Sequence, residues 1–292
     1  MKDIIVITGP TGVGNTKLSI ELAKRLDAEI INADSMQVYK SLNIGTAKIK
    51  ENEKENIKHH LFDIVDVNDM YTVYDYQKDG REAINKILLN KKKVIIVGGT
   101  GLYIKALLYD YKFEKENKTF DFSNLTNEEI YKKILDKNGE CNIHINNRKR
   151  LERAYTKILN NNTNCKVTSE KIYDFDIIGL TTSRDNLYKI INNRVEIMVN
   201  DGLLDEVRQL YDKNIYSKSI TTGIGYKELY KYFNKEISYD DAIELIKRNS
   251  RRYAKRQYTF FNNQFDIKWF ETNYQDFSET VNDVLKYLYT NK

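Results

Sequence analysis

The sequence predicts an α/β fold, a P-loop-type parallel sheet flanked by helices and interrupted by a helical insertion domain. Apolar runs of strand length alternate with longer stretches of helical periodicity, which is typical of parallel sheets. The first run, residues 3–8, passes through a glycine-rich turn straight into a helical pattern. After residue 112 the chain becomes polar and irregular, and no apolar strand follows until residue 175. We therefore expect a catalytic core made of residues 1–112 and 173–292, and a helical insertion at 113–172.

The glycine-rich turn Gly9-Pro10-Thr11-Gly12-Val13-Gly14-Asn15-Thr16 has the layout of a phosphate-binding P-loop, the usual site of a nucleotide such as ATP. Its glycines let successive backbone N–H groups surround an anion, and the dipole of the next helix adds to the attraction. Thr16 stands where the P-loop hydroxyl holds a phosphate or its magnesium ion. Asn15 replaces the usual lysine, and Lys17 leaves the helix about 200° further round. The alternative, a turn without a ligand, is disfavoured because the whole motif follows a strand and precedes a helix.

Two further strand ends are expected beside this loop. The run 28–34 ends on Asp34, and the run 93–97 is followed by Gly98-Gly99-Thr100-Gly101. Ligands of open parallel sheets collect at the carboxyl ends of the strands, so Asp34 and Thr100 should face the ligand of the P-loop. Asp34 is equally typical of a helix N-cap. The second glycine-rich turn is also compatible with plain strand-to-helix geometry, so both alternatives stay open.

Composition narrows the class of protein. The chain has 292 residues and a formal net charge of +5, and it lacks an apolar run of about 18 residues, so we expect no membrane span. Because an apolar strand is predicted from residue 3, we expect no signal peptide. Cys141 and Cys165 are expected to be free thiols of a cytoplasmic protein. His59 and His60 are adjacent, so their side chains diverge. They are expected to anchor a loop rather than to bind a metal.

Basic residues gather in two clusters that suit a polyanionic partner. The first lies at residues 148–153, inside the predicted insertion. The second, residues 247–256, lies on a long helix that Ser238 and Asp241 open with a pattern like a capping box. Like charges on neighbouring turns repel unless something neutralises them. We therefore interpret the second cluster as a binding face, with a solvated helix face as the alternative.

Taken in order, seven motifs closely resemble those of bacterial tRNA dimethylallyltransferases, and together they extend over nearly the whole chain. The motifs are Gly9–Thr16, Asp34-Ser35-Met36-Gln37, His59-His60-Leu61, Gly98–Tyr103, Gly202–Val207, Gly223–Glu228 and Arg252–Gln257. The resemblance implies transfer of a dimethylallyl group from its diphosphate to the exocyclic N6 of the adenosine next to the tRNA anticodon.

The resemblance also implies roles for individual residues. Asp34 would be the base, Thr100 and Arg208 would contact the reacting centre and the diphosphate, and Mg2+ would lie near Thr16. The diphosphate would bind Gly9, Thr11, Gly12, Val13, Gly14, Asn15 and Thr16. Gln37 would help read the flipped-out base. The anticodon stem–loop would contact Asp34, Ser35, Met36, Gln37, Thr100, Asn147, Arg148, Lys149, Arg150, Leu151, Arg251, Arg252 and Arg256. Nothing in the sequence requires more than a monomer.

Three positions depart from the family pattern. Asn15 replaces a lysine, Asn147 an aspartate, and Asn262, after Phe260-Phe261, an arginine. Removing one charge-assisted contact to a diphosphate costs about 1.5–3 kcal/mol, so a slow transferase is expected. Two alternatives stay open, a catalytically silent relative that still binds tRNA and a P-loop kinase of a small metabolite. The kinase is least favoured because it has no use for two basic clusters, and loss of the lysine would impair phosphoryl transfer at least as much.

Overall fold

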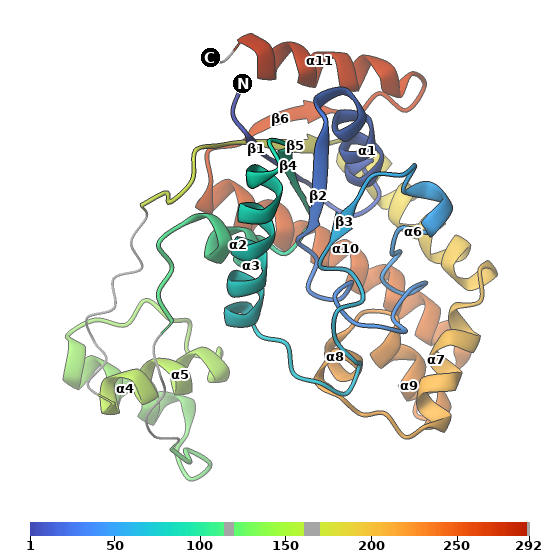
Figure 1. Ribbon diagram of the computed structural model, residues 1–292. Coiled ribbons are helices and arrows are strands. Elements are labelled where there is room, and N and C mark those ends of the chain that lie inside the picture. The colour runs from blue at the N-terminus through green and yellow to red at the C-terminus, as the bar shows by residue number, and fades with distance from the viewer. Residues whose placement is uncertain (114–119, 161–169, 291–292) are drawn as a thin grey trace. The chain divides into compact units, whose positions relative to one another are not determined.

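The computed structural model describes residues 1–113, 120–160 and 170–290 (Figure 1). The chain forms two compact units, a core unit of Met1–Tyr109 with Lys171–Lys292 and an insertion unit of Asp110–Glu170. The insertion unit overlaps the predicted insertion, 113–172, apart from a few residues at either boundary. Cys141 is a free thiol, and Cys165 lies outside the described residues.

The core unit contains a six-stranded parallel sheet with the strand order β3-β2-β4-β1-β5-β6. Its strands are β1 Ile4–Thr8, β2 Ala28–Asn32, β3 His59–His60, β4 Lys93–Val97, β5 Phe175–Thr181 and β6 Lys268–Glu271. β1, β2 and β4 are apolar almost throughout because helices cover both faces of the sheet. The predicted second strand ends two residues early, at Asn32, and the chain then leaves the sheet through Asp34.

Helices pack on both faces of the sheet, and successive residues of β1 point to opposite faces. The helices of the core unit are α1 Asn15–Leu26, α2 Val73–Leu89, α3 Gly101–Leu108, α6 Arg184–Asn200, α7 Leu203–Asp212, α8 Lys218–Thr222, α9 Tyr226–Phe233, α10 Tyr239–Gln264 and α11 Phe277–Thr290, with a 3-10 turn η1 at Glu51–Glu53. Ile4 and Val6 pack with α2, α3 and α10, whereas Ile5 and Ile7 pack with α1, α6 and α11. Among the described helices, none is both long and apolar enough to cross a membrane.

Local signals account for several helix boundaries. Gly202 has a φ of +99°, in the left-handed region that glycine tolerates, and it separates α6 from α7. The Ser238 hydroxyl accepts a hydrogen bond from the backbone N–H of Asp241 at 3.1 Å, which caps α10. α10 continues through Gln264, and the last strand, β6, begins at Lys268.

The insertion unit has a small core of its own. It contains α4, Asn127–Asn138, and α5, Arg148–Leu159. Apolar side chains of both helices pack together with Phe122, and the Thr126 hydroxyl caps α4. The buried residues of this core are Phe122, Ile130, Ile134, Leu151, Tyr155 and Ile158.

Candidate active site

The carboxyl ends of β1, β2 and β4 open into a cavity of about 580 Å³ within the core unit. The P-loop, the start of α1 and residues 34–37 line one part of it. Residues 45–47, one face of α6, residues 222–227 and part of α10 complete the wall. The cavity therefore lies where open parallel sheets bind their ligands.

The P-loop has a conformation that only glycine accommodates at key points. Gly14 has a φ of +105°, and a Cβ there would lie 2.7 Å from the Phe277 ring. Val13 is fully buried beneath the loop, and its backbone carbonyl accepts a hydrogen bond from the Thr272 hydroxyl at 2.8 Å. The other P-loop residues assigned to the diphosphate line the cavity, namely Gly9, Thr11, Gly12, Gly14, Asn15 and Thr16.

Asn15 folds back onto the loop that precedes it. Its side-chain Nδ2 donates to the backbone carbonyls of Gly9 at 3.2 Å and Pro10 at 3.3 Å. Its Oδ1 is buried and has no hydrogen-bond partner among the described residues. The side chain thus braces the loop through neutral hydrogen bonds and brings no positive charge to the cavity.

Asp34 is held beside the P-loop by its neighbours. Its Oδ1 accepts a hydrogen bond from the Met36 N–H at 2.8 Å, and its own N–H donates to Asn32 Oδ1 at 2.9 Å. Burial raises the pKa of the Asp34 carboxyl, while the positive charges of Arg194 and Lys48 act in the opposite direction. The Asp34 carboxylate therefore accepts a hydrogen bond from a backbone N–H two residues further on, as a capping aspartate does, and it also lines the cavity.

Thr100 supports the same segment without lining the cavity itself. Its Oγ1 accepts a hydrogen bond from the Ser35 N–H at 3.0 Å and lies 3.3 Å from the Ser35 hydroxyl. Ser35, Met36 and Gln37 all line the cavity. The glycine-rich turn after β4 therefore positions the Asp34 segment through Thr100.

Arg194 of α6 is a cavity residue that none of the sequence motifs indicated. Its guanidinium is buried, its Nε has no partner among the described residues, and burial lowers its pKa while Asp34 raises it. The available signal was a lone cation at helical spacing from Ile191 and Met198, which line the same cavity. Arg208 lies elsewhere. Its guanidinium stacks 3.7 Å from the centre of the Phe233 ring, and it does not line the cavity.

The basic cluster of α10 divides into parts with different surroundings. Lys247 pairs with Glu196 at 2.6 Å and Glu244 at 2.8 Å, so acids from outside the cluster neutralise it. Arg251 donates to Asn192 Oδ1 at 2.5 Å, whereas Arg252 is exposed. Arg256 lines the cavity. Acids thus neutralise Lys247, whereas Arg252 and Arg256 remain available to a ligand.

The residues predicted to grip tRNA from the insertion unit also differ in surroundings. Arg148 contacts Glu152 at 2.5 Å and donates to the carbonyls of Phe122 and Leu125, so it ties the unit together. Leu151 is fully buried in the unit's core, which corrects its assignment as an RNA contact. The Asn147 side chain accepts from the Arg150 N–H at 3.4 Å at the start of α5. The side chains of Lys149 and Arg150 are exposed.

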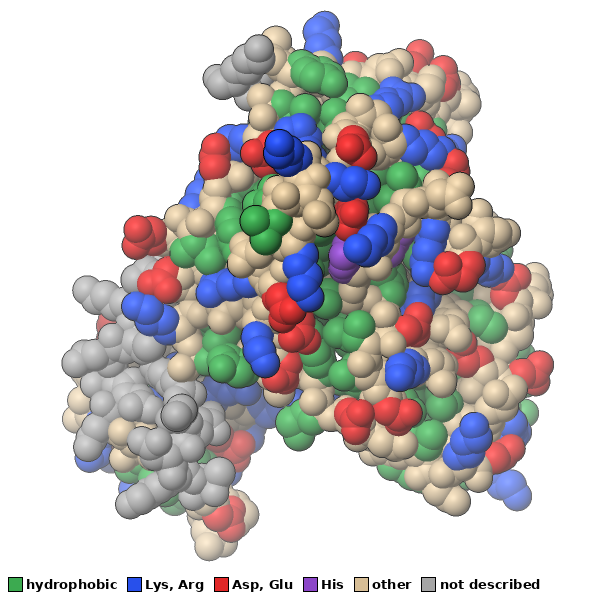
Figure 2. Space-filling model, in the orientation of Figure 1, with side chains coloured by type: hydrophobic (Ala, Val, Ile, Leu, Met, Phe, Trp, Pro, Cys, Tyr) green, Lys and Arg blue, Asp and Glu red, His purple; other side chains and the backbone are tan. Residues whose placement is uncertain are grey.

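The histidine pair anchors an edge strand. His60 Nε2 lies 2.7 Å from Glu29 Oε2, and Lys58 and Lys92 also approach this carboxylate. Figure 2 shows histidine side chains beside lysine or arginine and acidic side chains on the face over β3. His59 Nδ1 lies 2.7 Å from the Ile57 carbonyl. No group of three or more His, Cys, Asp or Glu side chains gathers as a metal site within the described part of the chain.

Comparison with known proteins places the chain in one family. The family model described as IPP transferase matches residues 37–264. The chain is 46% identical over 286 residues to the tRNA dimethylallyltransferase of Bacillus subtilis, covering 92% of this chain and 90% of that protein. It is 42% identical over 299 residues to that of Anoxybacillus flavithermus, covering 98% and 96%.

Solved structures give the same result. The tRNA isopentenylpyrophosphate transferase of Bacillus halodurans is 36% identical with a TM-score of 0.79, over 99% of this chain and 96% of that one. The corresponding structure from Staphylococcus epidermidis is 37% identical with a TM-score of 0.76, over 99% of each chain. A eukaryotic dimethylallyltransferase described as acting on tRNA is 28% identical with a TM-score of 0.76, over 93% and 74%. The chain belongs to the IPP transferase family, the enzymes known as tRNA dimethylallyltransferases.

Proposed function

We propose that this chain transfers a dimethylallyl group from dimethylallyl diphosphate to N6 of the adenosine 3′ of the tRNA anticodon. The observation that carries the proposal is one cavity shared by a phosphate-binding loop, a carboxylate and two arginine side chains, in a chain of this family. In the reaction, N6 forms a bond to the allylic carbon, and the C–O bond to the diphosphate breaks with its electron pair. The proton released from N6 goes to a base.

The P-loop is the proposed site of the diphosphate. Its backbone N–H groups and the first turn of α1 attract an anion. Arg194 and Arg256 line the same cavity, and the Arg194 Nε, which has no partner within the described part of the chain, can donate to an anion. These groups oppose the negative charge that develops on the leaving group. Arg194 thereby takes the diphosphate-binding role that the resemblance gave to Arg208.

Magnesium is compatible with the residues that line this part of the cavity. Mg2+ keeps several waters and needs few protein ligands when a phosphate supplies others. The Thr16 hydroxyl, at the start of α1, is such a ligand and lines the cavity beside the P-loop. A bound Mg2+ would neutralise charge on the diphosphate.

Asp34 is the proposed base. Its carboxylate lies at the end of β2 with one oxygen held by the Met36 N–H at 2.8 Å. A buried carboxylate with a raised pKa is better matched to proton abstraction near neutral pH than an exposed aspartate. The amine of adenine is a weak nucleophile, so a base within hydrogen-bond reach accelerates its attack.

The tRNA contacts are proposed at cations that the protein leaves available. Lys149 and Arg150 are exposed on the insertion unit, Arg252 is exposed on α10, and Arg256 lines the cavity. Gln37, which lines the cavity beside Asp34, is proposed to read the extruded base. We propose that the protein acts as a monomer in the cytoplasm.

The test is product formation from an unmodified anticodon stem–loop RNA, dimethylallyl diphosphate and Mg2+. Measurable transfer is expected from the chain as it stands. No product at high enzyme concentration, together with activity in Asn15→Lys, would instead identify a tRNA-binding relative that has lost catalysis. That alternative has a specific observation in its favour, because Asn15 brings no charge to the loop. Transfer of labelled phosphate from ATP to a small metabolite would indicate a kinase.

A further inference from the structure

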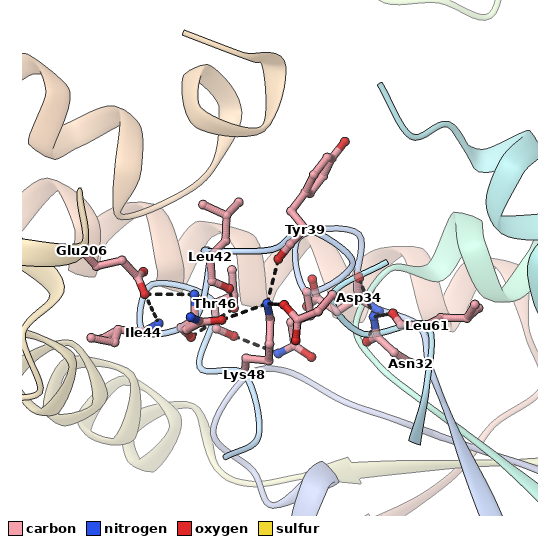
Figure 3. A network of polar contacts seen from close by, with 12 residues as sticks. Asn32, Asp34, Tyr39, Leu42, Ile44, Thr46, Lys48, Leu61 and Glu206 are labelled. Carbon is pink, nitrogen blue, oxygen red and sulfur yellow. Dashed lines mark hydrogen bonds and ion pairs between the residues drawn. The ribbon is translucent and has the colours of Figure 1, made fainter. Parts of the chain in front are cut away.

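Residues 43–47, here called loop 43–47, follow β2 and are held by a carboxylate that is distant in the sequence. Glu206 of α7 accepts backbone N–H hydrogen bonds from Asn43 at 3.0 Å, Ile44 at 2.8 Å and Gly45 at 3.1 Å. It also accepts from the Tyr226 hydroxyl at 2.7 Å. Figure 3 shows Glu206 reaching the loop beside Ile44. The N–H groups of the loop therefore surround an anion that the protein itself supplies.

This loop forms part of the cavity wall. Gly45, Thr46 and Ala47 line the cavity. The side-chain amide of Gln37, on the Asp34 side of the cavity, donates to the Thr46 carbonyl at 2.9 Å. The position of that carbonyl therefore fixes the direction of the Gln37 amide. A displacement of the loop would therefore break this hydrogen bond or turn the Gln37 amide with it.

The rest of the loop is anchored by a buried lysine. Lys48 donates to the Tyr39 carbonyl at 2.7 Å (Figure 3). It also donates to Asn43 Oδ1 at 3.0 Å and pairs with Asp63 at 2.5 Å. Burial lowers the pKa of Lys48, and the Asp63 carboxylate opposes this effect. Lys48 therefore joins the end of the loop to Tyr39 and Asp63, whereas Glu206 joins residues 43–45 to α7.

Tyr226 leaves the loop little room to move. A Cβ on Gly45 would lie 2.7 Å from the Tyr226 ring, so glycine is needed for this close approach. Glu206 Oε1 binds both the Gly45 N–H and the Tyr226 hydroxyl. Glu206 thus joins loop 43–47 and Tyr226 through one carboxylate oxygen.

We propose that Glu206 is a positioning residue for base recognition. It holds loop 43–47, and through the Thr46 carbonyl it sets the Gln37 amide. The inference rests on the proposed function, in which Gln37 reads the base. The P-loop is anchored separately, through the Thr272 hydroxyl on the Val13 carbonyl at 2.8 Å. Loosening loop 43–47 should therefore weaken RNA recognition and leave diphosphate binding intact.

The test compares two ligands in Glu206→Gln. The side-chain amide keeps the shape of the carboxylate, but its NH2 group cannot accept the hydrogen bonds made by one of the two oxygens. The Kd for stem–loop RNA and the KM for RNA are expected to rise about tenfold, while the Kd for inorganic diphosphate changes less than about twofold. Gly45→Ala, which pushes the loop against Tyr226, should give the same split.

Glu228→Gln is the matched control for general destabilisation. Glu228 is also buried and accepts hydrogen bonds from the Gly225 N–H at 2.8 Å and Asn249 at 2.7 Å, but it does not hold loop 43–47. It should lower the midpoint of thermal unfolding and leave the ratio of the two Kd values unchanged. An unchanged RNA Kd in a folded Glu206→Gln, or a parallel loss of diphosphate binding, would overturn the inference. Absence of transfer by the parent chain would refute the proposed function alone, because both Kd values are measured without turnover.

Discussion

Asn15→Lys should accelerate prenyl transfer. In the parent chain, the Asn15 amide makes two neutral hydrogen bonds to loop carbonyls, at 3.2 Å and 3.3 Å, and its Oδ1 has no partner among the residues that the structure describes. A lysine at this position adds one charge-assisted contact to the diphosphate, worth about 1.5–3 kcal/mol. If the contact is completed only in the transition state, kcat rises by about ten- to a hundredfold with little change in KM.

The effect on folding of this substitution should be small. Two neutral hydrogen bonds contribute about 0.5–1.5 kcal/mol each, but a buried acceptor without a partner carries a cost of similar size. Because Asn15→Lys removes both the bonds and the unpartnered oxygen, the thermal midpoint should stay close to that of the parent. The increase in kcat can then be attributed to the new contact in the site and not to a change in stability.

Single-turnover transfer to stem–loop RNA at saturating dimethylallyl diphosphate is the appropriate assay. Asn15→Met is the matched control, since it supplies a long side chain of similar reach without the charge. The control should be no faster than the parent. A lysine variant that reacts no faster than Asn15→Met would refute the reasoning, because the missing charge would then not limit the reaction.

Three further predictions follow from the site. Transfer should decline as the pH falls through the raised pKa of Asp34, because the base must be ionised, and a pH-rate profile checks this. Asp34→Ala should abolish turnover while the RNA affinity, measured by titration, stays within about twofold of the parent. Arg194→Ala should weaken diphosphate binding about tenfold or more, whereas Arg208→Ala should leave it unchanged, by calorimetric titration. Arg252→Ala should weaken RNA binding and flatten its dependence on salt, whereas Arg148→Ala should chiefly lower the stability of the insertion unit.

Features encoded by consecutive residues could be predicted from the sequence. The P-loop, the first and fourth strands and the cap of α10 each depend on a few adjacent residues and on backbone geometry, so their signals are local. Asp34 was expected at the carboxyl ends of the strands because it follows a strand of the parallel sheet directly. The resemblance supplied the expected reaction, and the comparisons confirm the family.

Features that depend on contacts between distant segments could not be predicted in the same way. Arg194 and Arg208 are both arginines on helical patterns, and only the packing of α6 and α7 decides which one lines the cavity. Glu206 was part of a motif, but its partners at residues 43–45 are about 160 positions away in the sequence. Arg148 and Leu151 belong to one basic-looking stretch, yet one ties the insertion unit together and the other fills its core.

The departure at Asn15 and the family assignment are independent of each other. The family model matches residues 37–264, which begin after the P-loop, so the assignment does not depend on a normal loop. The cations that line the cavity from α6 and α10, Arg194 and Arg256, also lie outside the loop. A diphosphate bound there would still meet positive charge without a P-loop lysine. The substitution therefore removes one contact from a site whose other charged groups persist, which favours a slow enzyme over an inactive one.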